Sequence, residues 1–133
     1  MRLLLDTHIL IWVVFHPGRL AAAARRLITD EANEKLFSVA SIWETAIKSA
    51  LGQPGFTVDP ARLAEAARLD FTELVITSAA ALRAGALPQH HRHPFDRLLV
   101  AQAIEEDARL LTVYRKLSAY GPVIRSTTRV NPE

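Results

Sequence analysis

Short apolar segments alternate with longer helical segments along most of the chain, and this alternation limits the fold more than any other feature. The apolar segments have the length and composition of buried strands, and one of them begins at a proline, which a sheet tolerates at its edge. They are residues 3–5, 35–40, 73–76, 109–112 and 122–125. Strands that alternate with helices predict an α/β sandwich around a mainly parallel sheet of four or five strands.

Helical segments lie between the predicted strands. Thr7 and Ser41 are candidate N-caps for the helices that follow the first and second strands. The helices are expected after Thr7 to near Pro17, and at about residues 20–29, 41–51, 60–69, 78–86 and 95–107. The last of these is apolar nearly all round, which predicts a position at the centre of the fold. A length of 133 residues, half of them hydrophobic, suits one domain covering residues 1–133.

The charge balance and the absence of cysteine exclude several classes of protein. With 16 basic and 14 acidic residues, the net charge of +2 permits an anionic partner without demanding one. With no cysteine, disulfide frameworks and thiolate metal sites are excluded. The apolar start is broken by Asp6 and His8, and the run at residues 9–15 is too short to span a bilayer. We therefore expect a soluble cytoplasmic protein that does not contact membranes.

Three acids distant in the sequence are predicted to meet at one edge of this sheet. Asp6 follows the first strand, and Glu44 lies one turn into the helix after the second strand. Asp96 lies in the first turn of a helix that runs back towards the start of the fourth strand. In parallel sheets, ligands bind outside the carboxyl ends of the strands, and all three acids are expected there.

Three carboxylates at close range repel one another strongly unless a cation lies among them. Mg²⁺ and Mn²⁺ prefer oxygen ligands, and such an ion polarises a phosphoryl oxygen and lowers the pKa of bound water. The sequence therefore predicts metal-dependent phosphodiester hydrolysis at Asp6, Glu44 and Asp96. Thr7 and Thr112 are expected beside the cleft, where their hydroxyls would orient a ligand or water.

Each of these acids also has a purely structural interpretation. The pattern from Ser41 to Glu44 is that of a capping box, and Glu44 is also spaced to pair with Lys48 on one helix face. Asp96 in a first helical turn is favoured by the helix dipole, and Asp6 is a possible cap for its own helix. These interpretations explain each acid singly but not the convergence of all three.

The same residues carry a resemblance to a known family. The stretches LLDTH at residues 4–8, SVASIWETAIK at 38–48 and PFDRLLVAQA at 94–103 resemble consecutive blocks of PIN-domain toxins of the VapC type. Residues 111–121 resemble a further block. The likeness extends over about residues 3–124, and the order of the blocks is more specific than any block alone.

This resemblance implies a three-layer α/β/α PIN fold and Mg²⁺- or Mn²⁺-dependent endonucleolytic cleavage of RNA. It also implies a VapB-type antitoxin as partner, contact with operator DNA only through that antitoxin, and a homodimer. Asp6, Glu44 and Asp96 match three acidic positions of the family. Lys48, Arg92 and Arg97 are candidate contacts to RNA phosphates, with ordinary surface charge or ion pairs to the site acids as the alternative.

Two positions depart from the family's pattern. Tyr114 stands where relatives usually have Asp, and His93 stands where they often have Asp. One fewer anion is expected to weaken divalent-ion binding, most clearly for a second ion. Our hypothesis is therefore an enzyme with one metal ion, with a PIN scaffold that binds RNA or antitoxin without efficient cleavage as the alternative.

Two further functions compete with these. The histidine-rich residues 89–93 suggest a zinc site, but no cysteine supports it and the spacing is tighter than in structural zinc sites. A solvated loop facing RNA or a second subunit is the preferred interpretation. A phosphoacceptor signalling domain needs paired acids after the first strand and a lysine at a late strand end. Here Asp6 stands alone, and Lys116 is expected in a turn or short helix.

Overall fold

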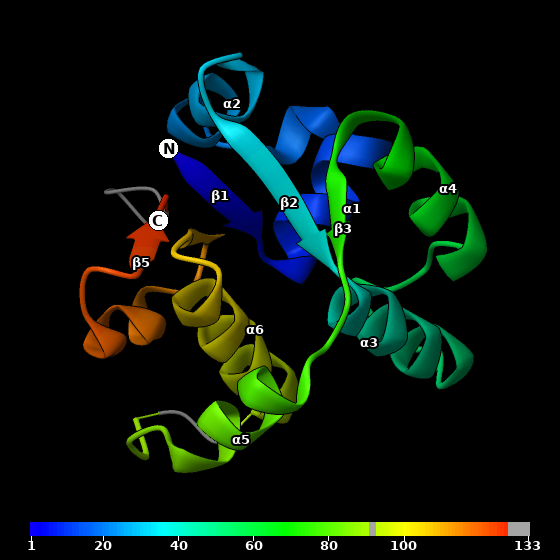
Figure 1. Ribbon diagram of the computed structural model, residues 1–133. Coiled ribbons are helices and arrows are strands. Elements are labelled where there is room, and N and C mark those ends of the chain that lie inside the picture. Colours follow the sequence, from blue (N-terminus) through cyan, green and yellow to red (C-terminus); the bar gives the residue numbers. More distant parts are fainter. Residues whose placement is uncertain (91–92, 128–133) are drawn as a thin grey trace.

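The computed structural model describes residues 1–90 and 93–127, which form a five-stranded sheet with helices against both faces (Figure 1). The strands are β1 (Arg2–Leu5), β2 (Glu34–Ser38), β3 (Thr72–Leu74), β4 (Arg109–Thr112) and β5 (Ile124–Ser126). The helices are α1 (Thr7–Phe15), α2 (Ala22–Thr29), α3 (Val39–Ala50), α4 (Pro60–Asp70), α5 (Ser78–Ala86) and α6 (Pro94–Glu105), with short 3₁₀ helices η1 (Pro17–Arg19) and η2 (Arg115–Tyr120). The predicted α/β sandwich is confirmed.

The central strands β1, β2 and β4 end in buried, mainly apolar residues because both faces of the sheet are covered there. Leu5 and Leu111 belong to a core cluster with residues of α1, α2 and α4 on one face. Leu4 and Leu110, one residue earlier in each strand, belong to a second cluster with Leu99 and other residues of α6. Successive side chains of a strand point to opposite faces, so a three-residue run such as residues 3–5 contributes to both cores.

The strand order places a topological switch next to β1. The sheet has the order β3-β2-β1-β4-β5, and the four pairings of these strands are all parallel. The chain therefore builds outward from β1 to β3 and then crosses to the other side of β1 for β4 and β5. A crevice forms at the carboxyl ends of strands where the order reverses, here between β1 and β4.

Several of the expected element boundaries differ from the structure by a few residues, most informatively at two helix caps and at the last strand. The N-cap of α1 is Asp6, whose side chain accepts a hydrogen bond from the Thr7 N–H, so the prediction of Thr7 as the cap was wrong. The N-cap of α3 is Ser38 rather than Ser41, because β2 passes directly into the helix and Ser38 accepts from the N–H of Ala40. At the other end, β5 is an edge strand as predicted but begins at Ile124, two residues after Pro122.

The central position predicted for the helix at about residues 95–107 is also confirmed. Seven residues of α6 are buried from Asp96 to Ala103, and Gln102 reaches both Ser38 and the backbone of Val75. This helix therefore ties β2 to the segment after β3. Within residues 1–90 and 93–127, no helix is both long and apolar enough to span a bilayer.

Candidate active site

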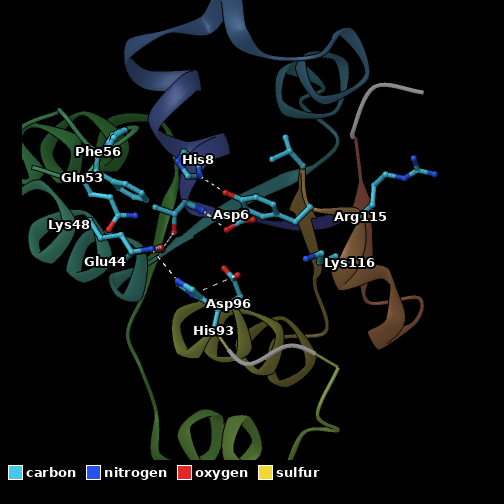
Figure 2. Close-up of a pocket in the computed structure, with 14 residues that line it drawn as sticks. Asp6, His8, Glu44, Lys48, Gln53, Phe56, His93, Asp96, Arg115 and Lys116 are labelled. Carbon is cyan, nitrogen blue, oxygen red and sulfur yellow. Dashed lines mark hydrogen bonds and ion pairs between the residues drawn. The ribbon is translucent and has the colours of Figure 1, made fainter. Parts of the chain in front are cut away.

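A cavity of about 540 Å³ opens at the carboxyl ends of β1 and β4, between the starts of α3 and α6 (Figure 2). All three acids predicted to converge line it. The lining residues are Asp6, Thr7, His8, Glu44, Lys48, Gln53, Pro54, Phe56, His93, Asp96, Val113, Tyr114, Arg115 and Lys116. The order of strands and helices along the chain thus brings together carboxylates that are up to 90 residues apart.

Asp6 lies at the end of β1 and is 1 % exposed. Its Oδ1 accepts a hydrogen bond of 2.7 Å from the Thr7 N–H, and its Oδ2 accepts one of 2.5 Å from the Thr112 hydroxyl. Burial, and secondly the negative charge of Asp96, raises the pKa of Asp6 to about 7 in spite of these two donors. An acid held in this way is close to the midpoint of its titration at neutral pH, and a nearby cation would drive it to the carboxylate form.

Glu44 lies in the second turn of α3 and is also buried. Its Oε1 accepts a 2.6 Å hydrogen bond from the Thr7 hydroxyl, and its Oε2 is 2.6 Å from the Nζ of Lys48. Ser41 does not cap the helix, so the capping-box interpretation of Glu44 was wrong. The pairing with Lys48 is present, but in a buried setting rather than on a solvated helix face.

Asp96 lies in the first turn of α6 and is 8 % exposed. His93, the N-cap of the helix, places its Nδ1 3.7 Å from the Asp96 Oδ2. Pro94 at the first helical position fixes the backbone where the chain enters the helix. The helix N-terminus thus holds a carboxylate against the cavity, close enough to Asp6 for its charge to raise the pKa of that residue.

The acids of the cavity suit a divalent cation held by two carboxylates and water better than one surrounded by protein ligands. No group of three acids or histidines in the described part of the chain lies close enough to surround one ion. Asp6 and Asp96 face the same cavity, however, and Mg²⁺ is commonly held by one or two carboxylates together with several waters. The expectation that all three acids clasp a single ion is thus not met in this arrangement, whereas a site on Asp6 and Asp96 agrees with the chemistry of the donors.

Tyr114 lies where an additional acid was expected from the family pattern. Its hydroxyl is 2.7 Å from the Nδ1 of His8, whose ring also packs on Phe56 with centroids 4.8 Å apart. Burial and the neighbouring acids raise the pKa of Tyr114, so the phenol is uncharged at neutral pH. Burial lowers the pKa of His8. Gly55 approaches this ring closely, since a Cβ there would lie 3.2 Å from the His8 Nε2.

Arg97 is not one of the cavity-lining residues, so its predicted role as an RNA contact is corrected. Its guanidinium donates hydrogen bonds to the backbone carbonyls of Ala84, Leu87 and Pro88, at 2.8, 3.0 and 3.1 Å. Arg97 is buried and links the end of α5 to the start of α6. The prediction left Arg97 as either a phosphate contact or a surface charge or ion pair, because sequence alone does not show which carbonyls a buried guanidinium meets. Arg92 lies outside the described residues.

Lys48 does line the cavity, and two further cations line it that were not predicted as site residues. Arg115 and Lys116 lie at the start of η2, just after β4, and Figure 2 shows them on the side of Asp6 opposite Lys48. Their position could have been predicted in the same way as that of Tyr114, because all three residues follow β4. Gln53 and Phe56 had no such signal, since they come from the irregular segment after α3.

Most of the chain matches the model of a known protein family. The family model described as "PIN domain" matches residues 3–121. The chain belongs to the PIN-domain family. Among curated proteins, no sequence matches it significantly.

Two solved structures resemble this PIN domain closely in fold. One is VapBC2 from Rickettsia felis bound to a DNA fragment from its promoter, with a TM-score of 0.68 and 16 % identity over 95 % of this chain and 98 % of that one. The other is VapBC-1 from nontypeable Haemophilus influenzae, with a TM-score of 0.65 and 20 % identity over 96 % and 98 %. At these identities the likeness establishes the fold.

Proposed function

We propose that this PIN domain is a metal-dependent endoribonuclease that acts as the toxin of a type II toxin–antitoxin pair. The observation that carries the proposal is the convergence of Asp6 and Asp96 in one cavity, where burial and mutual charge raise the pKa of Asp6 to about 7. Buried acids with perturbed pKa values in a cleft are characteristic of functional sites. A fold alone would not need this unfavourable arrangement.

The residues of the cavity divide the chemical tasks between them. Asp6 and Asp96 would hold Mg²⁺ or Mn²⁺, and Glu44 lies in the same cavity. Such an ion polarises a phosphoryl oxygen and supplies a water of lowered pKa. Thr112 and the Thr7 N–H orient the Asp6 carboxylate through their hydrogen bonds. These two donors fix the orientation of the Asp6 side chain.

The cations of the cavity favour a nucleic-acid backbone as substrate, and we propose that this backbone is RNA. Lys48, Arg115 and Lys116 line the same cavity as the three acids. Cations beside the metal-binding carboxylates are suited to phosphates on either side of the bond that is cleaved. Arg115 and Lys116 thus replace Arg97 as candidate phosphate contacts.

The similar solved structures are toxin–antitoxin complexes, and we extend this to a partner for the present chain. The proposed partner is a VapB-type antitoxin, through which the pair would contact operator DNA. The toxin itself would act on RNA as a homodimer in the cytoplasm. The support for the partner is the extent of the structural likeness, which covers at least 95 % of this chain and 98 % of each neighbour.

RNA cleavage by purified protein tests the catalytic part of the proposal. Wild-type protein is expected to cut single-stranded RNA with Mg²⁺ or Mn²⁺ and to stop on chelation, and Asp96→Asn is expected to lose about a thousandfold or more in rate. Asp107→Asn is the matched control, because Asp107 is an exposed acid with a φ of 51°, which Asn also tolerates. Equal loss in both variants, or full activity of Asp96→Asn, would refute the assignment.

Growth on induction tests the toxin role separately. Expression of the wild-type chain in a bacterial host is expected to arrest growth, and Asp96→Asn is expected to relieve the arrest. Co-expression of the reading frame that adjoins the gene is expected to relieve it as well, if that frame encodes the antitoxin. Cleavage in vitro without growth arrest would support the nuclease activity and refute the toxin role.

A PIN scaffold with weak catalysis is the second candidate, and two contacts favour it. Tyr114 is bonded to His8 where an acid was expected, and Glu44 is paired with Lys48. Fewer unpaired carboxylates therefore remain in the cavity to attract a divalent cation. Under this alternative, Tyr114→Asp raises the cleavage rate well above that of the wild type, whereas an efficient wild-type enzyme gains little from the substitution.

A further inference from the structure

Lys48 is held in the cavity by contacts from three segments of the chain. Its Nζ lies 2.6 Å from the Oε2 of Glu44 on its own helix and 3.1 Å from the Nε2 of His93 at the start of α6. The same ammonium lies 4.9 Å from the centroid of the Phe56 ring and 5.8 Å from that of Phe95. A ring face attracts a cation, and a partly desolvated ammonium gains more from it than an exposed one. Lys48 is therefore a positioned cation, not a mobile surface side chain.

Glu44 is correspondingly occupied. Both of its oxygens have partners at 2.6 Å, the Thr7 hydroxyl on Oε1 and Lys48 on Oε2. The side chains of Glu44 and Lys48 are only 5 % and 15 % exposed, so solvent screens the pair little. A metal ion that took Glu44 as a ligand would have to approach this ammonium at close range, against strong repulsion.

From these contacts we propose that Lys48 is a resident cation that takes the place of a metal ion on Glu44. The cavity would then bind a single divalent ion, held by Asp6 and Asp96. Figure 2 shows Glu44 and Lys48 together on one side of Asp6, with Asp96 below it. The inference rests on the proposed function in assuming that a divalent ion binds here, and it adds how many bind and which acids take part.

The charges of the lining agree with one ion. The described lining residues include three carboxylates and, in Lys48, Arg115 and Lys116, three cations. Arg115 and Lys116 are seen on the other side of Asp6 in Figure 2, whereas Lys48 is in direct contact with an acid of the cluster. Once Lys48 balances Glu44, the carboxylates left to attract a cation are those of Asp6 and Asp96.

The number of Mn²⁺ ions bound by the full chain tests the proposal without any measurement of cleavage. Bound Mn²⁺ loses the electron paramagnetic resonance signal of the free aqueous ion, so titration counts the ions directly. We expect one ion on the wild type and one on Lys48→Arg, which keeps the charge. Lys48→Met, close in length but neutral, is expected to bind a second ion. Two ions on the wild type, or one on a folded Lys48→Met, would overturn the proposal.

The double variant Glu44→Gln/Lys48→Met decides the matter even if Lys48→Met alone does not fold, since it removes both charges of the buried pair. Because Glu44 is not a ligand in this proposal, this double variant should change Mn²⁺ affinity by less than about threefold, whereas Asp6→Asn should lower it by about thirtyfold or more. A loss in the double variant as large as in Asp6→Asn would make Glu44 a ligand and refute the role of Lys48. Absence of Mn²⁺ binding by the wild type would instead refute the proposed metal-dependent nuclease function.

Discussion

The two edges of the sheet use the same kinds of charged residue in opposite ways. At the amino edge, Arg2 at the start of β1 pairs with Glu34 at 2.9 Å and with Glu106 at 3.5 Å, and all three side chains are at least 36 % exposed. At the carboxyl edge, Asp6 directly follows the other end of β1. Its side chain is buried, and its pKa is raised to about 7.

The difference teaches which charges belong to the fold and which to the site. Exposed pairs are well solvated and change the free energy of unfolding little. Buried carboxylates that repel one another lower the stability of the protein, and a fold without a ligand gains nothing from them. The charged residues of the carboxyl edge thus lower the stability of the fold, whereas those of the amino edge change it little. Variants at the two edges test this contrast.

The largest effect on stability is expected from Asp6. Its folded-state pKa of about 7 lies above the ordinary value of 3.8, so the folded protein retains a proton that the unfolded chain releases between these values. The free energy of unfolding should therefore fall as the pH rises from about 4 to about 7. Asp6→Asn should remove this dependence and, with a chelator present, stabilise the protein at about pH 8 by up to about 4 kcal/mol, since one pKa unit is about 1.4 kcal/mol.

Urea denaturation across this pH range measures the effect, and Glu34→Gln is the control from the amino edge. That variant should keep the wild-type pH profile. A wild-type stability that rises steadily from about pH 4 to about pH 7 would mean that Asp6 is an ordinary acid in the folded protein.

A destabilisation of about 2–3 kcal/mol is expected for Arg97→Met, because the carbonyls of Ala84, Leu87 and Pro88 would lose a charged donor inside the protein. The exposed Arg83, which pairs with Glu105, supplies the matched control, and Arg83→Met should cost under about 1 kcal/mol. Chemical denaturation compares the two variants. Equal values would show that burial does not separate these arginines.

An intermediate effect is expected for Thr112→Val, which removes the hydroxyl donated to the Asp6 Oδ2 at 2.5 Å. Loss of this donor raises the pKa of Asp6 further, and a metal ion must then displace a more firmly held proton. Mn²⁺ affinity at about pH 6 should fall roughly tenfold, and the loss should shrink as the pH rises above about 8. Calorimetric titration at several pH values measures it. A pH-independent loss would point to a displaced carboxylate instead.

The smallest effect is expected at the amino edge. Arg2→Ala removes the ion pairs to Glu34 and Glu106 and should lower the free energy of unfolding by less than about 1 kcal/mol, with a dependence on salt. Mn²⁺ binding and RNA cleavage should not change. A large change in either would connect the two edges and break the comparison.

Much of the site could be predicted because it follows from the direction of the elements. Asp6 comes directly after an apolar run, and Asp96 opens a helix that leads back to the next strand, so the parallel sheet brings both to one edge. Lys116 fell in a short helix as expected. These positions depend on chain order, which is visible in the sequence.

Positions that depend on side-chain partners could not be predicted. Arg97 and Asp96 are neighbours in the sequence, yet one binds backbone carbonyls away from the cavity and the other lines it. Ser41 had the spacing of a cap, but the strand continued into the helix three residues earlier. Whether a side chain forms a helix cap or an ion pair depends on which groups of the neighbouring elements lie within hydrogen-bonding distance.

By itself, the sequence determined a parallel α/β sheet and the edge at which Asp6, Glu44 and Asp96 gather, because apolar periodicity and the direction of each segment are local properties of the chain. Only the tertiary structure decided that Glu44 is paired with Lys48 and that Tyr114 is bonded to His8. Those contacts join residues from separate segments, and their distances are set by how α3, α6 and the end of β4 pack around one cavity.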